Sequence, residues 1–349
     1  MSRFLNSALV ALTPYTPGEQ PQGGTFIKLN TNESPFPPSD GVLNILGRAE
    51  AEKLNLYSDP TLNPVTSSLA KRFGVENKNV YAGNGSDEVL AIAMYAFGEK
   101  GFSFPDITYG FYNVIADFFR IGCTRPKLRD DFTIDISDYM KNDRAVIIAN
   151  PNAPTGIFLP LSEIEKILSA NPDHVVIVDE AYVEFGGESA ASLVSKYENL
   201  LVVGTFSKAW NLAGARLGYA VGNSELISDL NRLRCSFHPY NINRLTLLAG
   251  QKAVEEEQYY IECRKKIIAT RVRVQAELES LGFTCTPSMA NFIFARPPMG
   301  DAERIYKALY DKKVLVRYFA SGRTKEYLRI SVGSDEQMDK FLDALKSIL

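Results

Sequence analysis

The sequence has few of the residues that build metal sites, hydrolase triads or disulfide frameworks. Its 349 residues include two histidines and four cysteines, and the cysteines are scattered without a CxxC pair. Zinc sites and disulfide-stabilised folds need clustered cysteines and histidines. The chain also lacks the GxSxG turn of a nucleophile elbow. We therefore expect no metal, a reducing compartment and chemistry carried by other side chains.

Long apolar runs and blocks of like charge are also missing. No apolar stretch approaches the roughly 20 residues that cross a bilayer. The polar, proline-bearing start of the chain does not resemble a signal peptide. The formal net charge is −3 and there is no basic cluster, which disfavours a nucleic-acid-binding protein. The sequence therefore predicts a cytoplasmic protein without a membrane or nucleic-acid partner.

What the chain does contain is the pattern of a large α/β domain. Between about 41 and 230, apolar runs of strand length alternate with helical stretches. The runs lie at 80–83, 145–149, 175–178 and 201–203, with a further strand predicted at 215–221. Runs that are apolar on both faces are typical of a mostly parallel sheet between helices.

The C-terminal third has a different pattern and predicts a smaller α+β domain. A long helical segment from Asn241 to Leu281 ends at Gly282, a residue type common at helix C-caps. Strands are predicted at 291–295, 314–317 and 327–332, followed by a helix from Asp335. We predict three parts: an N-terminal arm at 1–40 associated with the small domain, a large domain at 41–240, and a connecting helix with the small domain at 241–349.

Ligands of open α/β sheets bind beyond the carboxyl ends of the strands, so polar residues after each predicted strand are site candidates. Lys208 follows one such strand in GTFSKAWNLAGARLG, between Ser207 and Arg216. A lysine that forms a Schiff base needs a desolvated site near other cations. Hydroxyl and guanidinium groups suit a cofactor phosphate. A surface lysine is the alternative for Lys208 taken alone.

Asp179 ends another predicted strand in HVVIVDEAYVEF. A carboxylate there can pair with the protonated pyridine nitrogen of pyridoxal 5′-phosphate (PLP), which keeps the ring an electron sink. It can also be a simple helix N-cap or turn residue. Tyr182 could place its hydroxyl near the ring oxygen O3′, or be a half-buried core tyrosine.

A glycine-rich turn in YAGNGSDEVL offers a second set of phosphate donors. Gly85, Ser86 and Asp87 present backbone N–H groups at a predicted helix N-terminus. Ser and Asp are also ordinary N-cap residues. The turn-forming NPNAPTG at 150–156 falls at the same edge of the sheet. Tyr109 in PDITYGFY is a candidate for stacking on a planar ring, with buried aromatic packing as the alternative.

Together these segments resemble fold-type I PLP-dependent enzymes, and specifically the histidinol-phosphate aminotransferase family. The matching stretches occur in the family's order: TPY at 13–15, LNTNESP at 29–35, YSDP at 57–60, GNGSDE at 83–88, PDITYGFY at 105–112, NPNAPTG at 150–156, VDEAY at 178–182, TFSKAWNLAGARLG at 205–218, LVRYF at 315–319 and LRISVG at 328–333. VDEAY followed by SKA and a downstream arginine is specific for the PLP fold. The TPY, LVR and LRISVG elements narrow the resemblance to the histidinol-phosphate branch.

The resemblance implies PLP as cofactor, held as a Schiff base on Lys208. It implies that Asp179 pairs with the pyridine nitrogen, Tyr182 contacts O3′ and Tyr109 stacks on the ring. The residues implied around the phosphate are Gly85, Ser86, Asp87, Ser207 and Arg216.

The resemblance also implies a homodimer and a substrate grip. Tyr57, which by chemistry alone is a plain loop aromatic, matches the residue donated to the phosphate by the other subunit. Arg329 matches the arginine that holds the anionic end of the substrate, with Arg317 and Tyr15 beside it. Ordinary ion-pair residues are the alternative for the two arginines.

One position departs from the family pattern. The family usually has an asparagine directly before PTG that bonds O3′, and this chain has Ala153 there. Asn152 is the nearest candidate to take over, although a one-residue offset can turn a side chain the other way. Either Asn152 compensates or Tyr182 holds O3′ alone.

The implied reaction is a ping-pong transamination of histidinol phosphate and 2-oxoglutarate to imidazole acetol phosphate and glutamate, in histidine biosynthesis. An amino donor and a 2-oxo acid acceptor are the small-molecule partners, and Lys208 shuttles the proton as general acid/base. Arg317 with Arg329 favours a substrate phosphate over an α-carboxylate. The alternatives are an aromatic amino acid aminotransferase, a related PLP decarboxylase and a non-catalytic PLP-fold binding or regulatory protein.

Overall fold

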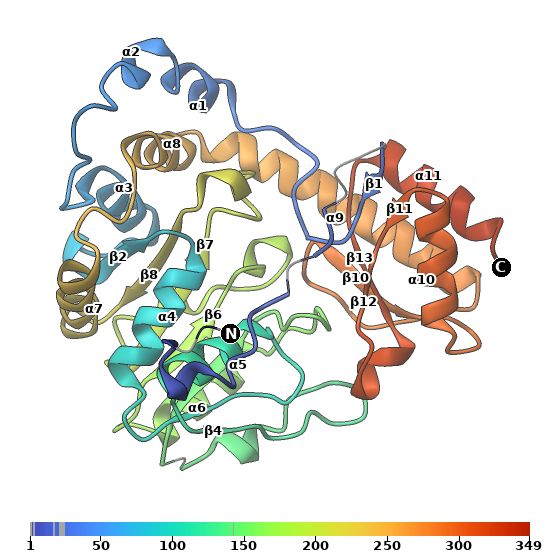
Figure 1. Ribbon diagram of the computed structural model, residues 1–349, viewed down its shortest axis with the longest axis horizontal. Helices are drawn as coiled ribbons and strands as arrows, with labels where there is room; N and C mark the ends of the chain where they lie inside the picture. The colour runs from blue at the N-terminus through green and yellow to red at the C-terminus, as the bar shows by residue number, and fades with distance from the viewer. Residues whose placement is uncertain (1, 3, 17, 21–24, 142) are drawn as a thin grey trace.

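The computed structural model describes residues 2, 4–16, 18–20, 25–141 and 143–349, and a central sheet organises the first two thirds of this chain (Figure 1). Its spatial strand order among the described residues is β2 (Val80–Gly83), β8 (Gly218–Gly222), β7 (Leu200–Thr205), β6 (Val176–Asp179), β5 (Ala145–Ala149), β3 (Phe102–Ser103) and β4 (Cys123–Thr124). β8 runs antiparallel to β2 and β7, while the other neighbouring pairs are parallel. The predicted mostly parallel sheet is confirmed.

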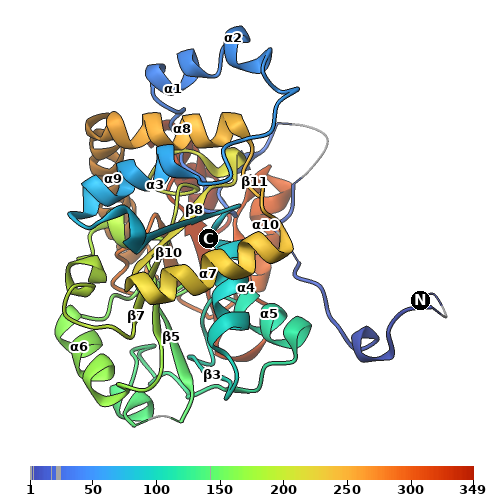
Figure 2. The same cartoon turned by 90° about the vertical axis from the view of Figure 1, so that its left-hand side faces the viewer.

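Side chains of the central strands alternate between two hydrophobic clusters, one on each face of the sheet. In β5, Val146 and Ile148 join one cluster while Ile147 joins the other. Each face therefore needs a covering layer of helices. One face is covered by α4 (Ser86–Phe97), α5 (Phe111–Phe119) and α7 (Ser224–Phe237), and the other by α3 (Asn63–Phe73), α6 (Leu161–Ala170) and α8 (Arg244–Glu255). Figure 2 shows these helices around the sheet.

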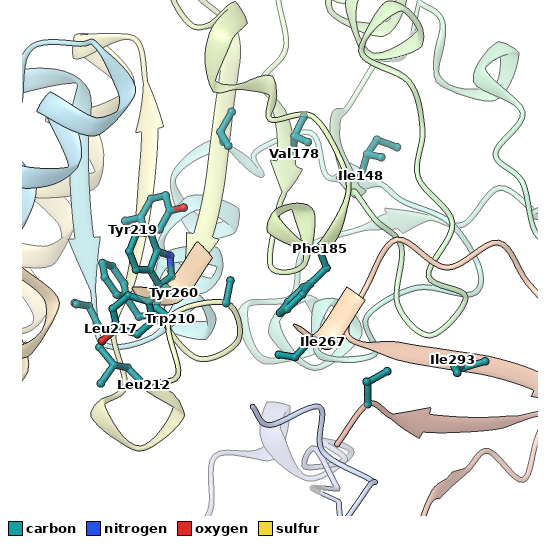
Figure 3. Packing of buried hydrophobic residues seen from close by; sticks show 14 of the residues in the cluster. Ile148, Val178, Phe185, Trp210, Leu212, Leu217, Tyr219, Tyr260, Ile267 and Ile293 are labelled. Atoms are coloured by element: carbon teal, nitrogen blue, oxygen red, sulfur yellow. The ribbon is translucent and has the colours of Figure 1, made fainter. Parts of the chain in front are cut away.

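The larger cluster also fixes the loop that carries Lys208. Phe206 and Trp210 flank the lysine and are fully buried in this cluster. Trp210 packs against Tyr260, with ring centroids 5.4 Å apart (Figure 3). The loop is thus held on both sides by buried aromatic rings, which restrict where the lysine can point.

A second, antiparallel sheet forms the C-terminal part. Its strand order is β12 (Arg317–Tyr318), β13 (Leu328–Ser331), β10 (Phe292–Arg296) and β9 (Thr284–Cys285), with α10 (Ala302–Asp311) and α11 (Asp335–Lys346) packed beside it. The prediction of one strand at 314–317 is wrong in part. β11 (Val314–Leu315) pairs with β1 (Ile27–Lys28), and only from Arg317 does the chain join β13.

The helical segment predicted from Asn241 to Leu281 is two helices. α8 ends at Glu255, and α9 (Glu257–Ser280) begins after Glu256. α8 packs against α3 and α1 (Asp40–Ile45), whereas α9 runs on to the C-terminal sheet (Figure 1). The chain changes direction at Glu256 because α8 and α9 cover different parts of the molecule.

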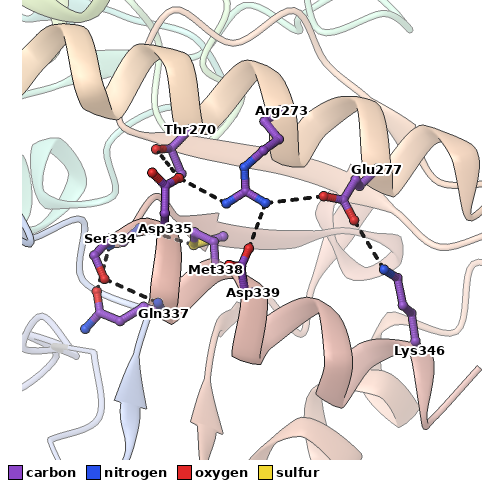
Figure 4. A network of polar contacts seen from close by, with 10 residues as sticks. Thr270, Arg273, Glu277, Ser334, Asp335, Gln337, Met338, Asp339 and Lys346 are labelled. Carbon is purple, nitrogen blue, oxygen red and sulfur yellow. Dashed lines mark hydrogen bonds and ion pairs between the residues drawn. The ribbon is translucent and has the colours of Figure 1, made fainter.

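Ion pairs and hydrogen bonds tie α9 to α11 (Figure 4). Arg273 bridges Asp335 at 3.0 Å and Asp339 at 2.7 Å, and Lys346 pairs with Glu277 at 3.2 Å. These pairs are partly exposed, so each contributes little stability alone, but together they fix the angle between the two helices.

The N-terminal segment lies along the C-terminal sheet before it enters the large sheet. Leu29 N–H donates to the Leu315 carbonyl at 2.8 Å, and Ser331 N–H donates to the Leu29 carbonyl at 2.9 Å. The short 3-10 helix Ser7–Leu9 projects away from the rest of the chain (Figure 2). The domain limits at 40 and 240 stay predictions.

The remaining elements are short. They are α2 (Arg48–Ala51) and 3-10 helices at Ser7–Leu9, Asn77–Asn79, Ile136–Tyr139, Val183–Phe185, Ala190–Leu193, Ala213–Ala215 and Gly322–Glu326. Across the described ranges, none of the helices combines the length and apolar character required to traverse a bilayer. The same residues contain no cluster of three His, Cys, Asp or Glu side chains that could hold a metal ion.

Candidate active site

A cavity of about 650 Å³ lies at the carboxyl edge of the central sheet. Most of the predicted site residues line it: Tyr15, Ser86, Asp87, Tyr109, Asp179, Tyr182, Ser207, Lys208, Arg216, Arg317 and Arg329. They come from the segments after β2, β3, β6 and β7, the turn before β8, the N-terminal arm and the C-terminal sheet. Because β8 is antiparallel, its starting turn reaches the same edge as the ends of its neighbours, which explains the position of Arg216.

Lys208 extends into this cavity with its amine largely removed from water. Its Nζ donates a hydrogen bond to the Thr31 carbonyl at 3.1 Å. Burial lowers the pKa of the amine to about 8, and the positive charge of Arg329 acts in the same direction. A neutral amine is the nucleophilic form, so the site prepares this lysine for bond formation with a carbonyl carbon.

Asp179 is a buried carboxylate at the end of β6. Tyr112 donates its hydroxyl to Asp179 Oδ2 at 2.6 Å, and the Ala181 N–H donates to Oδ1 at 3.2 Å. Burial raises the pKa of Asp179 to about 6, against the effect of these two hydrogen bonds. Asp179 forms no ion pair with any described residue. It can therefore receive a protonated ring nitrogen from the cavity.

Asp87 and Arg216 form the end of the cavity that can hold a phosphate. Arg216 pairs with Asp87 at 3.1 Å and donates to Ser207 Oγ at 3.2 Å. Tyr109 donates to the other oxygen of Asp87 at 2.9 Å. Since the Asp87 carboxylate accepts both bonds, only its backbone N–H is available to an anion.

Gly85 does not line the cavity but makes this end of it possible. Its φ is +86°, in the region that favours glycine, and a Cβ there would lie 2.5 Å from Arg216 Nη2. The glycine therefore leaves room for the guanidinium at the start of α4. Any side chain would displace Arg216 from Asp87.

Arg317 and Arg329 face each other across neighbouring strands of the C-terminal sheet. Arg329 donates to the Asn30 carbonyl at 3.0 Å, while its Nε is buried without a hydrogen-bond partner. Burial and the charge of Arg317 lower the pKa of Arg329. Like charges placed opposite each other are unfavourable. This end of the cavity is therefore suited to a ligand anion that balances them.

Tyr15 closes the same side of the cavity from the N-terminal arm. Its ring meets Tyr109 edge-on at 6.3 Å and Phe111 at 5.6 Å. Burial raises the pKa of its hydroxyl, although Arg317 acts against this shift. The hydroxyl therefore remains a donor near the two arginines.

Besides Gly85, two predicted residues do not line the cavity, Asn152 and Tyr57. Asn152 donates through Nδ2 to the Ile107 carbonyl and to Thr155 Oγ1, both at 3.0 Å, so its amide is engaged away from the cavity. The one-residue offset from Ala153 has turned the side chain to the other side. Tyr57 is 82% exposed and stacks on Tyr240, with ring centroids 4.6 Å apart.

Sequence reasoning missed two residues that contact the site. Tyr112 bonds Asp179, and Asn32 donates through Nδ2 to the Tyr182 hydroxyl at 3.0 Å. Tyr112 lies three residues after Tyr109, so the second tyrosine of PDITYGFY was a usable signal. Asn32 gave no comparable chemical signal within LNTNESP.

The sequence from residue 24 to residue 345 matches the family model described as aminotransferase class I and II. The chain belongs to this aminotransferase family. The cavity is lined by both Lys208 and the buried carboxylate Asp179, which suits an aminotransferase, and the resemblance seen in the sequence is confirmed.

Similar proteins support the same assignment. The aminotransferase is 48% identical over 353 residues to histidinol-phosphate aminotransferase of a Marinomonas species, covering 100% of both chains. It is 45% identical over 352 residues to that of Brachyspira hyodysenteriae, covering 100% of this chain and 99% of the relative. The crystal structure of histidinol-phosphate aminotransferase from Sinorhizobium meliloti in complex with PLP superposes with a TM-score of 0.84 at 25% identity, over 92% of this chain and 90% of that one. The predicted fold class is confirmed.

Proposed function

We propose that this aminotransferase uses PLP to transfer the amino group of histidinol phosphate to 2-oxoglutarate, in histidine biosynthesis. The observation that carries the proposal is the pair Arg317 and Arg329 facing the same cavity as Lys208. Histidinol phosphate carries its amine on the carbon next to the one that bears the phosphate ester, and the cavity offers Lys208 near the amine and the two arginines near the phosphate. The names of the relatives support this choice of substrate.

The residues at the sheet edge fit PLP. Asp179 is a buried carboxylate without a cationic partner among the described residues, which suits a protonated ring nitrogen. Ser207 and Arg216 lie beside the start of α4, where backbone N–H groups favour a phosphate. Lys208 would carry the aldehyde carbon, and Tyr109 would lie against the ring. PLP, when bound, supplies the electron sink that stabilises negative charge at the substrate Cα.

The protein's own part in the reaction is binding, orientation and proton transfer. With PLP bound, Lys208 would be the group that moves a proton between the substrate Cα and the cofactor C4′. Its lowered pKa leaves a substantial neutral fraction near neutral pH, so the amine can accept that proton. Arg317, Arg329 and Tyr15 hold the phosphate end of the substrate, which fixes Cα relative to Lys208.

We extend the proposal to a homodimer in which Tyr57 reaches the phosphate site of the partner subunit. Tyr57 lies outside its own chain's cavity and is exposed together with Leu54, Leu56, Phe237 and Tyr240. An exposed group of large apolar side chains is typical of a protein–protein contact. The four unpaired cysteines suit a reducing compartment, and we propose a cytoplasmic location.

A specificity comparison tests the substrate. With 2-oxoglutarate as acceptor, kcat/KM should be higher for histidinol phosphate than for phenylalanine or tyrosine. Arg317→Ala should lower the value for histidinol phosphate by about 10- to 100-fold, the cost of one charged hydrogen bond to a phosphate, and change the aromatic substrates much less. Equal losses for all three substrates would contradict the phosphate assignment. Release of CO2 without a 2-oxo acid acceptor would instead indicate a decarboxylase.

A further inference from the structure

Asn32 connects the C-terminal sheet to Tyr182 and is 1% exposed. Its Nδ2 lies 3.0 Å from the Tyr182 hydroxyl oxygen, and its Oδ1 lies 2.9 Å from Ser331 Oγ. Asn291 donates to the Asn32 carbonyl at 3.0 Å. Asn32 adopts φ of 55°, a conformation that asparagine tolerates better than most residues. Each polar group of this residue therefore has a defined partner.

The hydrogen bonds to Ser331 determine which way the Asn32 amide points. The Asn32 backbone N–H donates to Ser331 Oγ at 2.8 Å, so the serine oxygen is an acceptor in that contact. Its single hydroxyl proton is then donated to Asn32 Oδ1. With Oδ1 facing Ser331, the Nδ2 donor must face Tyr182. The reverse amide orientation would leave the Ser331 proton without this acceptor.

The Tyr182 oxygen consequently accepts a hydrogen bond from Asn32, and its own proton is not used in that contact. Among the described residues, no acceptor for this proton is present within hydrogen-bond distance of Tyr182. Tyr182 lines the cavity, so the proton is available to an acceptor inside it. A hydrogen bond received by a hydroxyl oxygen also strengthens that hydroxyl as a donor.

The segment that carries Asn32 is bonded both to the C-terminal part of the chain and to Lys208. Leu29 is bonded to Leu315 and Ser331 of the C-terminal part, and the Thr31 carbonyl accepts from Lys208 at 3.1 Å. Thr31 and Asn32, which are neighbours in the sequence, thus contact Lys208 and Tyr182 respectively. Asn32 is held by the C-terminal sheet while it bonds Tyr182, which lies three residues beyond the end of β6.

We propose that Asn32 is a positioning residue that directs the Tyr182 hydroxyl proton toward the ring oxygen of the bound cofactor. The inference rests on the proposed use of PLP at Lys208. With Asn152 engaged elsewhere and Ala153 unable to donate, Tyr182 is the donor to that oxygen, and Asn32 fixes its direction. A donated hydrogen bond stabilises negative charge on the ring oxygen and so makes the adjacent nitrogen of Lys208 less basic.

The test is a pH titration of the visible absorbance band of the PLP-loaded protein. Asn32→Gly removes the amide and suits the positive φ, so it avoids backbone strain. It should raise the pH midpoint by about 0.5 unit, and Tyr182→Phe by about 1 unit, as expected for weakening or losing one hydrogen bond. Asn32→Asp keeps the acceptor for Ser331 but replaces the donor to Tyr182 with an acceptor. Its midpoint should approach that of Tyr182→Phe.

A double-mutant cycle shows whether the effect passes through Tyr182. Asn32→Gly should cause no additional shift in the Tyr182→Phe background, and an undiminished shift there would overturn the proposal. Asn30→Ala is the matched control, because Asn30 is a buried asparagine of the same segment whose amide donates to the Glu19 carbonyl. It should leave the midpoint unchanged, whereas a shift equal to that of Asn32→Gly would indicate a purely structural effect and contradict the assignment.

The titration also separates this inference from the proposed function. None of the substitutions at Asn32 or Asn30 removes any of the charged or titratable groups around Tyr182, which are Arg329, Lys208, Asp179, Asp87, Tyr15, Tyr109 and Tyr112. A wild-type band that persists in Lys208→Ala would overturn the cofactor assignment and, with it, the inference. A normal wild-type titration with no shift in Asn32→Gly or Asn32→Asp would overturn the role of Asn32 alone.

Discussion

The arginines at the two ends of the cavity differ in how their charges are balanced. Arg216 pairs with Asp87 and is partly exposed to solvent. Arg329 faces Arg317 across two paired strands, and within the described part of the chain it forms no ion pair with a carboxylate. At one end the arginine is paired with a carboxylate of the protein, while at the other the charge of Arg329 lies beside that of Arg317.

From this difference we assign the cofactor, which stays bound, to the Arg216 end, and the substrate, which is exchanged, to the Arg329 end. The charge of Arg216 is already compensated by Asp87 and by solvent, so the Arg216 end can accept a cofactor phosphate at little cost. Two adjacent guanidinium groups gain most from an anion, since it relieves their repulsion as well as making new bonds. The Arg329 end therefore favours binding of a substrate that carries an anionic group.

The largest expected effect is on the amino donor at the Arg329 end. Arg329→Gln should lower kcat/KM for histidinol phosphate by about 100- to 1000-fold, because a partly buried charged partner of the substrate is removed. The affinity for PLP should change by less than about 3-fold, since Arg329 does not lie at the phosphate end. Steady-state kinetics at saturating PLP, together with fluorescence titration of the cofactor, measures both values.

Arg296→Gln is the matched control for this loss of charge. Arg296 lies on β10, which neighbours β13, but it pairs with Glu326 at 2.7 Å and does not line the cavity. Its substitution should leave both constants within about 3-fold of the wild type, as expected for an exposed ion pair. If the two variants lost activity equally, the effect would come from the sheet and not from the cavity.

A smaller effect is expected at the Arg216 end. Arg216→Gln should weaken PLP binding by about 10- to 100-fold, as for the loss of one hydrogen bond to a charged group. Once the cofactor is saturating, kcat/KM for histidinol phosphate should fall less than in Arg329→Gln. Equilibrium dialysis gives the first value and steady-state assays the second. If Arg216→Gln instead impaired donor binding more than cofactor binding, the assignment of the two ends would be reversed.

The residues that sequence analysis placed correctly in the cavity share one physical property. Lys208 and Asp179 follow apolar runs whose length and β-branched composition encode strands locally. The carboxyl ends of parallel strands meet at one edge, so a local pattern predicts a three-dimensional neighbourhood. Arg216 was reached differently, from its closeness in sequence to Ser207 and Lys208, because the antiparallel direction of β8 is not encoded in the local pattern.

The features that the sequence did not predict depend on contacts between distant segments. Asn32 bonds Tyr182 across 150 positions and Ser331 across 299, and no local periodicity reports such pairs. The direction of the Asn152 amide depends on the turn geometry around it. The predicted strand at 314–317 is split into β11 and β12 because of contacts with distant segments as well. Strand propensity does not specify which partner strand is chosen.

The smallest expected effect concerns the contribution of a second subunit to the Arg216 end. Tyr57→Phe removes one neutral hydroxyl, so PLP binding should weaken by about 2- to 10-fold, less than in Arg216→Gln. Tyr240→Phe is the matched control, because Tyr240 stacks on Tyr57 and is also exposed. It should leave the PLP affinity unchanged in the same titration.

Mixed dimers show from which chain the Tyr57 hydroxyl comes. In a dimer of one Tyr57→Phe chain and one Lys208→Ala chain, only the first chain retains the lysine, and its phosphate site faces the intact Tyr57 of the second. PLP affinity at that site should therefore return to the wild-type value. An affinity that stays as low as in the Tyr57→Phe homodimer would mean that Tyr57 acts within its own chain. The Arg216 end would then be completed by one subunit, like the Arg329 end, and the two ends would differ only in the balance of their charges.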